Sequence, residues 1–406
     1  MSDKTLRLSQ VKNIALALGF DRIGITSAHP FPEAEEAMLA RLPYLKPLGW
    51  LTPERVRLSC RPREILPTGR SIISLAVGYE SSLEVAEHPD PTAGPSPARK
   101  RGAAPPSRRG KEAGGLGPPR GRLARYAWGP DYHTVLGQRL RSLVAGLRAL
   151  WGDDLEARTF VDTGPLAERA IAMRAGLGWQ GKNCTLITPT HGSWVFLAEV
   201  LVNVEVEPDA NPSPNLSPAQ GKEAYATALS RVGEGAKGLG PSSCDNCDRC
   251  LRACPTGALC APYTIDVARC LSYLTVEHRG SIPRDERPAL GNRVFGCDIC
   301  QEACPINARL KPASSALFPP DPSLAPGLDL LPLLSMSEEE YRRRYQHSAL
   351  KRAKRSGLRR NAAVALGNLG DEAAVPALAQ ALEDPDEVVR EHAAWALERL
   401  QGKAAH

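Results

Sequence analysis

Hydrophobic positions in the first half of the chain switch repeatedly between helical and strand-like spacing. Residues 6–28 pass from apolar positions at helical spacing into a short alternating stretch, which predicts a helix followed by a strand. Residues 71–79 and 157–162 are further strand candidates, and residues 135–151 have the spacing of a helix. This alternation predicts an α/β domain. Residues 184–207 hold two β-rich runs around a Thr-His-Gly-Ser turn, which predicts a hairpin.

Two stretches interrupt this pattern. Residues 84–122 are rich in Pro, Gly, Arg and Lys, and residues 208–243 are rich in Pro, Gly, Ser and Ala. Such compositions bury too little apolar surface to offset the entropy lost on ordering, so we interpret both as surface insertions. The basic first insertion could also touch nucleic acid, although a flexible loop is the simpler interpretation.

The apolar pattern near the carboxyl end repeats. The stretch NAAVALGNL at 361–369 resembles HAAWALERL at 392–400, and both place Ala and Leu at helical spacing. A repeated helical unit is typical of HEAT-like pairs, which bury their apolar faces by stacking on a neighbour. We therefore expect a C-terminal HEAT-like α-helical domain that packs against the domain before it.

Length and composition extend this picture to a multidomain protein. A chain of 406 residues exceeds the usual size of one hydrophobic core. We divide it into an α/β domain at 1–235, a cysteine-rich domain at 236–312 and a helical domain at 313–406. The expected fold class is therefore multidomain, with mixed α+β and α/β architecture. The net charge of +6 is small, but basic residues concentrate at 97–125 and 342–360.

The amino-terminal sequence bears on where the protein works. Residues 1–20 resemble an amphipathic helix and not a signal peptide, and no stretch approaches the roughly 20 apolar residues that a membrane helix needs. We therefore expect a cytoplasmic protein without a membrane partner. Thiols stay reduced in the cytoplasm, so the eleven cysteines indicate metal ligation in preference to disulfides.

The cysteine spacing is that of a ferredoxin-like domain with two clusters. The first run has the form C-x2-C-x2-C-x3-C followed by Pro255, and the second run, one cysteine shorter, is followed by Pro305. Cys270 supplies the missing thiolate. In two-cluster proteins the fourth cysteine of a run binds the other cluster. On that rule, one 4Fe-4S cluster is held by Cys244, Cys247, Cys250 and Cys304, and the second 4Fe-4S cluster by Cys254, Cys270, Cys297 and Cys300.

Structural zinc is the alternative, since it also takes four thiolates. Zinc sites usually pair two C-x2-C units and do not require three cysteines at successive steps of three with a proline after the fourth, so the spacing favours iron–sulfur clusters. The remaining cysteines, Cys60, Cys184 and Cys260, are expected to be buried small apolar side chains. Two adjacent clusters form an electron path, and we expect its end point in the α/β domain.

The stretch 160–187 is the strongest candidate for that end point. Asp162 follows a predicted strand and precedes a Thr-Gly-Pro turn into a helix, a position where ligands bind at the carboxyl edge of a sheet. The alternative is that Asp162 is the N-cap of this helix. The glycine-rich stretch GLGWQGKN ends in Lys182 and Asn183, and it either approaches a large ligand or forms a plain tight turn.

The stretch RYAWGPDYH at 125–133 gathers aromatic and charged residues, although a lone histidine such as His133 is more often structural than a ligand. Neither G-x-G-x-x-G after a strand nor G-x-x-x-x-G-K-[ST] occurs in the sequence. Nicotinamide binding, flavin binding on a Rossmann half and nucleotide hydrolysis are therefore poorly supported.

Six stretches together resemble the epoxyqueuosine reductase family: RYAWGPDYH, FVDTGPLAERAIAMRAGLGWQGKN, CDNCDRCLRACPTGAL, RCLSYLTVEHRGSIP, GNRVFGCDICQEACPIN and RRNAAVALGN. They follow one another in the family's order and are interrupted by the two insertions. The resemblance implies an oxidoreductase, related to reductive dehalogenases, that carries cobalamin and two 4Fe-4S clusters. Its substrate would be epoxyqueuosine at the wobble position of a tRNA anticodon loop, which it would reduce to queuosine.

The resemblance also implies roles for individual residues. Asp162 matches the proton donor of the family's VD-[ST]-x-P turn, and burial against the corrin should raise its pKa towards neutrality. The two sets of cysteines match the family's crossed ligation. The implied neighbours of cobalamin, besides Asp162, are Arg61, Lys182, Asn183, Arg269 and Asp298.

A tRNA enzyme needs a basic surface, because an anticodon loop presents a dense phosphate backbone. The tail carries a run of cations with few acids between them, and an ordinary solvated helical face is the alternative interpretation. The candidate tRNA contacts are Arg352, Lys354, Arg355, Arg359 and Arg360, together with Arg342, Arg343, Arg344 and Lys351. We also expect an external low-potential electron donor and a monomeric state.

Two other functions fit parts of the sequence. A respiratory reductive dehalogenase would use the same cofactors, but the chain shows no twin-arginine export signal and has the added basic tail. A ferredoxin-type electron carrier or an RNA-binding scaffold would hold the clusters without cobalamin.

Overall fold

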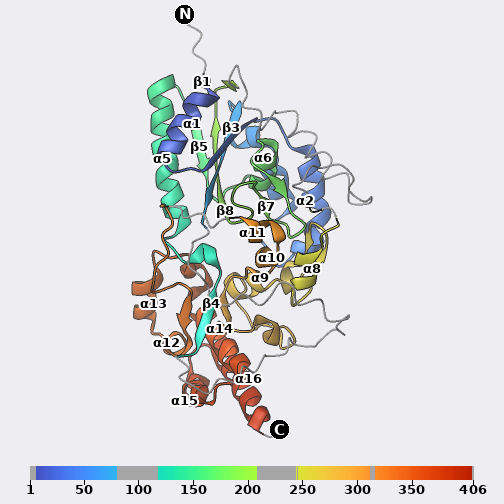
Figure 1. The fold of residues 1–406 in the computed structure, drawn as a ribbon, viewed down its shortest axis with the longest axis vertical. Coiled ribbons are helices and arrows are strands. Elements are labelled where there is room, and N and C mark those ends of the chain that lie inside the picture. Colours follow the sequence, from blue (N-terminus) through green and yellow to red (C-terminus); the bar gives the residue numbers. More distant parts are fainter. Residues whose placement is uncertain (1–5, 80–117, 208–243, 245, 311–315, 405–406) are drawn as a thin grey trace, which may run out of the picture.

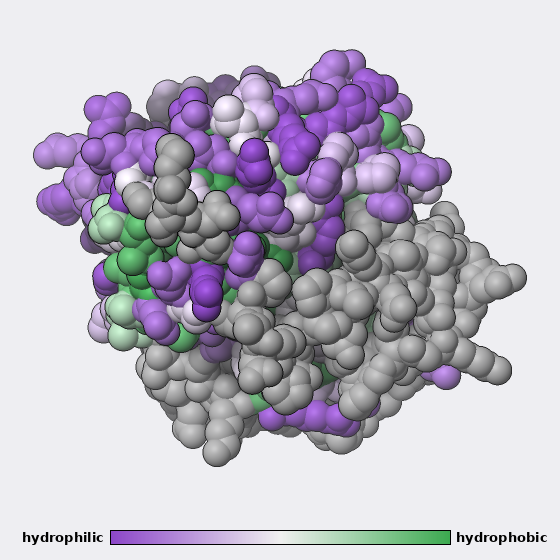
Figure 2. Space-filling view, turned by 90° about the horizontal axis from the view of Figure 1, so that it is seen from above, coloured by the Kyte–Doolittle hydropathy of each residue, from purple (hydrophilic) through white to green (hydrophobic). Residues whose placement is uncertain are grey.

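The computed structural model describes most of the chain; the described residues are 6–79, 118–207, 244, 246–310 and 316–404. The predicted insertion at 208–243, and most of the one at 84–122, lie outside these ranges. The amino-terminal half and the carboxyl-terminal helices form opposite ends of an elongated molecule, with the cysteine-rich segment between them (Figure 1). Seen from above, the described surface is mainly hydrophilic and has a small apolar patch (Figure 2). Within the described ranges, no helix combines the length and the hydrophobicity needed to cross a bilayer.

A four-stranded sheet forms the centre of the amino-terminal half. Its strands, in spatial order, are β2 (Arg22–Ser27), β3 (Ser71–Gly78), β8 (Val195–Val202) and β5 (Ala157–Phe160), and every neighbouring pair is antiparallel. The central strand β3 is buried along its whole length, because its side chains point alternately into two hydrophobic clusters on opposite faces. The small parallel pair β1 (Leu6–Arg7) and β9 (Val206–Glu207) lies apart from this sheet.

Helices cover both faces of the sheet. The long helices are α1 (Leu8–Ala17), α2 (Pro32–Leu45), α5 (Tyr132–Trp151) and α6 (Glu168–Arg174). Helices α1 and α5 share a hydrophobic cluster with Ile73, whereas α2 and α6 share the opposite cluster with Ile72. The predicted combination of a sheet with covering helices is confirmed. The strands are antiparallel, however, so the argument that placed Asp162 at the carboxyl edge of a parallel sheet does not hold.

The hairpin predicted at 184–207 is limited to its turn, where Thr188 and Gly192 form an antiparallel bridge, and the strands on either side do not pair with each other. Strand β7 (Leu186–Ile187) pairs with β6 (Trp179–Gln180), while β8 runs through the centre of the main sheet. Close packing fixes the β6–β7 unit, since a Cβ at Gly178 would lie 2.1 Å from the carbonyl oxygen of Ile187. A tight turn therefore explains the glycines of this stretch.

A second sheet joins three segments that are far apart in the sequence. Strand β4 (Arg120–Leu123) lies between β12 (Arg293–Phe295), to which it is parallel, and β13 (Gly327–Asp329), to which it is antiparallel. The insertion predicted to end at residue 122 therefore ends earlier, because β4 is a central strand.

The cysteine-rich segment consists of short elements that leave little room for a core of their own. They are α8 (Arg249–Ala253), β10 (Leu259–Ala261), β11 (Thr264–Ile265), η2 (Val267–Arg269), α9 (Leu271–Val276), η3 (Arg287–Leu290), α10 (Ile299–Glu302) and α11 (Pro305–Arg309).

The tail is helical, as predicted. Its long helices α14 (Lys354–Leu369) and α16 (Glu387–Ala404) pack closely, since a Cβ at Gly367 would lie 2.9 Å from Ala396. The shorter elements are α12 (Leu330–Ser335), α13 (Glu338–Tyr345), η4 (Ala349–Ala353), η5 (Glu372–Ala374), α15 (Val375–Gln380) and η6 (Ala381–Glu383).

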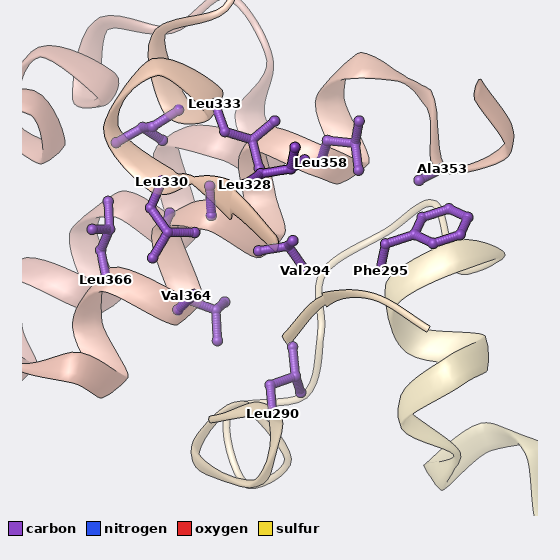
Figure 3. Close-up of a cluster of buried hydrophobic side chains, with 14 of the residues drawn as sticks. Leu290, Val294, Phe295, Leu328, Leu330, Leu333, Ala353, Leu358, Val364 and Leu366 are labelled. Atoms are coloured by element: carbon purple, nitrogen blue, oxygen red, sulfur yellow. The ribbon is translucent and has the colours of Figure 1, made fainter. Parts of the chain in front are cut away.

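One hydrophobic core spans the cysteine-rich segment and the tail. Leu290, Val294 and Phe295 belong to the same buried cluster as Leu358 and Val364 of α14 (Figure 3). Burial of apolar surface is the main favourable contribution to folding. Unfolding of either the cysteine-rich segment or the tail would therefore expose apolar surface of the other.

Buried polar side chains of α14 add to this shared core. Asn361 is fully buried and donates Nδ2 to the carbonyl oxygens of Thr275 and Val294, each at 2.8 Å. The neighbouring guanidinium of Arg360 donates to the carbonyl oxygens of Leu274, His278 and Gly280. These bonds give backbone carbonyl oxygens of the cysteine-rich segment hydrogen-bond donors that come from helix α14 of the tail.

We expect Asn361→Ala to lower the free energy of unfolding by about 1–3 kcal/mol, because two buried carbonyl oxygens lose their donor. Chemical denaturation of the full chain measures this change. The matched control is Asn13→Ala on the exposed side of α1, which should leave stability nearly unchanged. Equal stability of the two variants would contradict the role of Asn361.

Candidate active site

Asp162 lies on a tight turn after β5. The Thr163 N–H donates to the Val161 carbonyl oxygen at 2.6 Å. Asp162 has a φ of 53°, in the left-handed region that residues other than glycine rarely adopt, and half of its side chain is exposed. Helix α6 begins only at Glu168 and has Ala167 as its N-cap, so the N-cap alternative for Asp162 is wrong.

Two side chains from the start of α5 hold the Asp162 carboxylate. Tyr132 donates its hydroxyl to Asp162 Oδ2 at 2.7 Å, and His133 Nε2 lies 3.5 Å from the same oxygen. Both project from the first helical turn because Asp131 is the N-cap and accepts from the His133 N–H. His133, for which a structural role was the simpler expectation, is therefore part of this site.

Asp131 connects this site to the tail. Its side chain is 1% exposed, its Oδ1 lies 2.9 Å from His133 Nδ1, and its Oδ2 accepts from Lys351 Nζ at 2.6 Å. The contacts thus run from Lys351 of the tail through Asp131 and His133 to Asp162. Asp131 was not predicted from the sequence, although an aspartate directly before a helix is a recognisable N-cap signal.

These contacts set the protonation of the site. Burial opposes protonation of His133, but its contacts with Asp131 and Asp162 outweigh burial and raise its pKa to about 9. Burial alone would raise the pKa of Asp162, but contacts with His133 and Tyr132 outweigh it and lower that pKa. These are the contacts of protein side chains alone, so a pKa of Asp162 raised by burial against the corrin stays a prediction. At neutral pH the Asp162–His133 pair holds one proton, and it resides on His133.

The cysteines fall into two groups according to their mutual electrostatic influence. Charges act most strongly on near neighbours, so thiols that raise one another's pKa lie close together. Burial, followed by the charges of neighbouring thiols, raises the pKa of Cys250 to about 11. The neighbours of Cys250 in this first group are Cys244, Cys247 and Cys304.

The second group surrounds Cys300. Its pKa is raised well above the ordinary value, first by burial and then by neighbouring charges. The neighbouring thiols are Cys297, Cys270 and Cys254. The membership of the two groups is the same as that of the two sets expected from crossed ligation, whose role as cluster ligands stays a prediction.

Side chains outside the thiols hold the cysteine-bearing turns. Lys182 donates Nζ to the carbonyl oxygen of Cys247 at 3.0 Å. Asp298 is buried and accepts from the backbone N–H of Arg125 at 2.8 Å, and burial raises the pKa of Asp298 to about 6. These two predicted cobalamin neighbours therefore fix the loops that carry the first and second thiol groups.

Tyr126 links the second thiol group to the Asp162 site. Its pKa is raised first by burial and then by the charges of Asp162 and Asp298, so both carboxylates act on its hydroxyl. The aromatic rings of Tyr126 and Tyr132 meet edge to face at 6.2 Å. Because Asp298 directly follows Cys297, the second group lies close to Asp162.

Arg61 belongs to a segment that packs near the turn carrying Asp162, called the acidic turn below. It pairs with Glu35 at 2.8 Å and follows α3 (Pro53–Ser59) in the chain. This segment touches the acidic turn, since the Ala167 N–H donates to the Ser59 carbonyl oxygen at 3.0 Å. A surface hollow of about 800 Å³ beside it is lined by Pro30, Pro32, Glu35, Leu39, Arg61 and Glu64.

The other predicted neighbours of cobalamin make internal contacts. Asn183 is buried, and its Oδ1 accepts from the Thr185 hydroxyl at 2.8 Å. Arg269 pairs with Glu286 at 3.3 Å. Neither side chain is brought next to Asp162 by a contact in the described structure.

The three cysteines outside the two groups differ from one another. Cys60 is fully buried, as predicted, whereas Cys260 is exposed and Cys184 is half-buried at a φ of 65°. The prediction of a buried apolar role is therefore wrong for Cys260. Its strand β10 lies in a two-stranded sheet, which has too few neighbours to cover it.

Arg359 and Arg360 are not available to a phosphate backbone, so their prediction as tRNA contacts is wrong. Both are buried in the packing of α14. Arg359 forms an ion pair with Asp384, and Arg360 donates to the backbone as described above. The run of charges suggested a basic surface, but these two guanidiniums donate to carbonyl and carboxylate oxygens inside the molecule.

The other tail cations remain nearer the surface. Lys354 is exposed, Arg352 pairs with Glu277, and Arg355 is half-buried with its Nε donating to the Met336 carbonyl oxygen at 2.8 Å. On the preceding helix α13, Arg343 is exposed, while its neighbours Arg342 and Arg344 pair with acids one turn earlier.

Removing one carboxylate beside His133 provides a test of this network. In Asp131→Asn we expect the pKa of His133 to fall from about 9 towards the ordinary value of about 6.5. An NMR titration of the histidine ring measures it. The matched control is Asp154→Asn, an exposed residue before β5, which should leave the titration unchanged. An unaltered His133 titration in Asp131→Asn would rule out the pairing.

Comparison with protein families assigns each part of the chain. Residues 60–163 match the family described as "Epoxyqueuosine reductase QueG, DUF1730". Residues 243–307 match the "4Fe-4S double cluster binding domain", which agrees with the clusters expected from the cysteine spacing and not with zinc. Residues 347–405 match "HEAT repeats", which confirms the predicted tail.

Whole relatives give the same result. The epoxyqueuosine reductase of Bacillus cereus is 33% identical over 386 residues, which cover 95% of this chain and 87% of the relative. A crystal structure of epoxyqueuosine reductase with an epoxyqueuosine-modified tRNA-Tyr stem loop matches with a TM-score of 0.75 and 30% identity, covering 97% of this chain and 89% of that one.

A third relative concerns the acidic turn. The Bacillus subtilis epoxyqueuosine reductase, in a structure described with its catalytic aspartate loop swung out of the active site, matches with a TM-score of 0.73 and 30% identity over 97% of this chain and 90% of that one. The fold, the paired thiol groups and the helical tail therefore have one common explanation. This chain belongs to the epoxyqueuosine reductase family.

Proposed function

We propose that this chain is an oxidoreductase that reduces epoxyqueuosine to queuosine at the wobble position of a tRNA anticodon loop, as the names of its relatives indicate. The observation that carries the proposal is the half-exposed carboxylate of Asp162, which is held by Tyr132 and paired with a protonated His133. Asp162 also occupies a turn at an unfavourable φ, and the catalytic aspartate loop of the Bacillus subtilis relative is one that moves.

The reaction determines what this site must supply. Removing the epoxide oxygen as water consumes two electrons and two protons. Docking of the anticodon loop covers the half-exposed Asp162 carboxylate, and loss of water favours its neutral form, so the proton moves from His133 to Asp162. Asp162 then donates this proton to the oxygen on which negative charge develops.

Two 4Fe-4S clusters, held by the two thiol groups, would supply electrons to the site. We assign one cluster to the group around Cys250 and the other to the group around Cys300, on the basis of which thiols are neighbours. Asp298, next to Cys297 of the second group, acts on Tyr126 together with Asp162, so the cluster of this group would be the one nearer the site. An external low-potential donor would reduce the clusters.

The family implies a cobalamin cofactor, which when bound supplies low-potential electrons to the substrate carbon. One observation of the structure fits such a ligand. Trp179 Nε1, in the glycine-rich stretch, is buried and has no hydrogen-bond partner among the described residues, and an acceptor on a ligand would satisfy it. We assign Trp179, Asp162 and Arg61 to the surface facing the corrin. The loops around that surface are positioned by Lys182, Asn183, Arg269 and Asp298.

The tail supplies the surface for tRNA. Its accessible cations contact phosphates of the stem loop. They are Arg343 and Lys354, together with the half-buried Arg352 and Arg355. Lys351 connects this surface to Asp131. The monomeric state and the cytoplasmic location expected from the sequence belong to this proposal.

Replacing Asp162 by Asn tests the proton donor. Asp162→Asn keeps the size of the side chain and a hydrogen bond to Tyr132 but cannot donate a carboxyl proton, so conversion of an epoxyqueuosine-modified tRNA stem loop should fall by about 10²–10⁴-fold. The assay uses cofactor-loaded enzyme and a chemical reductant without oxygen. Binding of the stem loop should be unchanged. Turnover at the wild-type rate would remove Asp162 from the mechanism.

The same assay has a predicted pH dependence. The raised pKa of His133 means that the pair carries its proton below about pH 9 and loses it above, so wild-type conversion should decline as the pH rises through about 9. A rate that is constant between pH 7 and pH 10 would show that His133 does not hold the transferred proton.

Cys270 and Cys260 form a matched pair for the cluster assignment. Cys270→Ser removes one thiolate of the second group, and we expect about half of the bound iron to be lost, as measured by iron analysis after anaerobic reconstitution. Cys260→Ser, at an exposed thiol outside both groups, should retain all of it. Full iron content in Cys270→Ser would refute the second ligand set.

A further inference from the structure

Glu199 is a carboxyl group inside the central sheet. It lies on β8 between its register partners Ser74 of β3 and Phe160 of β5. Its exposed fraction is 0%, and neither of its carboxylate oxygens has a hydrogen-bond partner among the described residues. Ser74 Oγ beside it is likewise buried without a partner there. A buried polar group without a hydrogen-bond partner is unfavourable, so Glu199 reduces the stability of the sheet.

The side chain of Glu199 points to the face covered by α6. Leu197 and Leu201, two positions before and after it, pack in the hydrophobic cluster of that face. Helix α6 lies tightly on the same cross-strand row, because a Cβ at Gly24 would be 2.2 Å from the carbonyl oxygen of Ala175. The row ends at Phe160, two residues before Asp162.

Glu168 places a second carboxyl on that face. It is the first residue of α6, and its Oε1 is buried without a hydrogen-bond partner in the described structure. The charges of Glu168 and Asp162 both act on Glu199. Glu168 in turn faces Asp162, whose backbone N–H points to it, and also Arg169 and His133. Three carboxyl groups therefore influence one another: Glu199 inside the sheet, Glu168 at the start of the helix that covers it, and Asp162 on the half-exposed turn.

Electrostatics favours a proton on the inner two carboxyl groups. Burial, followed by the charges of Glu168 and Asp162, raises the pKa of Glu199 well above its ordinary value. Burial and then the charge of Asp162 raise the pKa of Glu168 to about 7, against the opposing effects of the Asp162 N–H, Arg169 and His133. Neighbouring carboxyls in an apolar site cannot both ionise, so they titrate as a pair.

We propose that Glu199 and Glu168 form a buried proton store behind Asp162, which supplies the second proton of epoxide reduction. The proposal rests on the proposed function, because that reaction consumes two protons and the Asp162–His133 pair holds one. After Asp162 has protonated the leaving oxygen, its carboxylate, whose neutral form is favoured while the docked stem loop excludes water, takes a proton from Glu168, and the proton that remains is shared by Glu199 and Glu168. Only O–H bonds break and form in this step, no electron moves, and solvent later returns a proton to the pair.

Infrared spectroscopy tests for the store without reference to turnover. The wild-type protein at pH 7 should show the C=O stretch of a protonated, buried carboxylic acid, and Glu199→Gln should remove it. Glu205→Gln, at an exposed position just beyond β8, is the matched control and should retain the band. If Glu199→Gln keeps the band, or the wild type lacks it, the proposal fails.

Kinetics then tests the role of the store. In the stem-loop assay, Glu199→Gln and Glu168→Gln should each slow conversion by about 10²-fold, the lower end of the general-acid range, with iron content and stem-loop binding unchanged. As the pH is raised, the conversion rates of both variants should begin to decline at a lower pH than the wild-type rate does. A loss of packing alone would not shift this pH. If Glu199→Gln does not fold, the kinetic assay of Glu168→Gln alone tests the role of the store. Wild-type rates and pH profiles in both variants would overturn the proposal, whereas an inactive wild type with the infrared band intact would count against the proposed function only.

Discussion

The hydrophobic core shared by the cysteine-rich segment and the tail is the constraint on which the rest of the structure depends. Short helices and strands bury too little surface to fold alone, and a segment of this kind usually relies on its metal or on a neighbour. Here α14 is the neighbour. It contributes Leu358 and Val364 to the core, and Asn361 to the backbone of the segment. The thiols are therefore positioned by a helical repeat as well as by their own loops.

The acidic site is assembled from separate parts in the same way. Asp162 comes from the turn after β5, Tyr132 and His133 come from the start of α5, and Lys351 comes from the tail. Each charge is compensated by a group from a different segment, so the protonation of Asp162 is a property of the assembled molecule. This explains why local sequence could locate the acid but could not determine its ionisation.

The sequence was most informative where chemistry dictates spacing. The cysteine runs had to place four thiolates around each cluster, and the repeated Ala and Leu positions of the tail had to bury one helical face, so both could be predicted. It was least informative where the role depends on what a side chain meets in space. Arg359 and Arg360 look like a basic surface along the sequence, but Arg359 donates to an oxygen inside the tail and Arg360 to oxygens of the cysteine-rich segment.

Two further differences have the same origin. The stretch at 184–207 has the composition of a hairpin, but strand pairing is decided by the whole sheet, and β8 is taken up between β3 and β5. Glu199 sits in an otherwise apolar strand, and nothing in its neighbours along the chain indicates that Glu168 covers it from α6. Contacts between distant segments decide both cases.

The sheet formed by β12, β4 and β13 has a consequence for biosynthesis. Its central strand emerges from the ribosome early, yet one partner follows after most of the cysteines and the other after all of them. Contacts between such distant segments form late, because loop closure must precede them. The thiols are thus presented in their final arrangement only after β13 has been synthesised, so assembly of the iron–sulfur clusters follows the pairing of these distant segments.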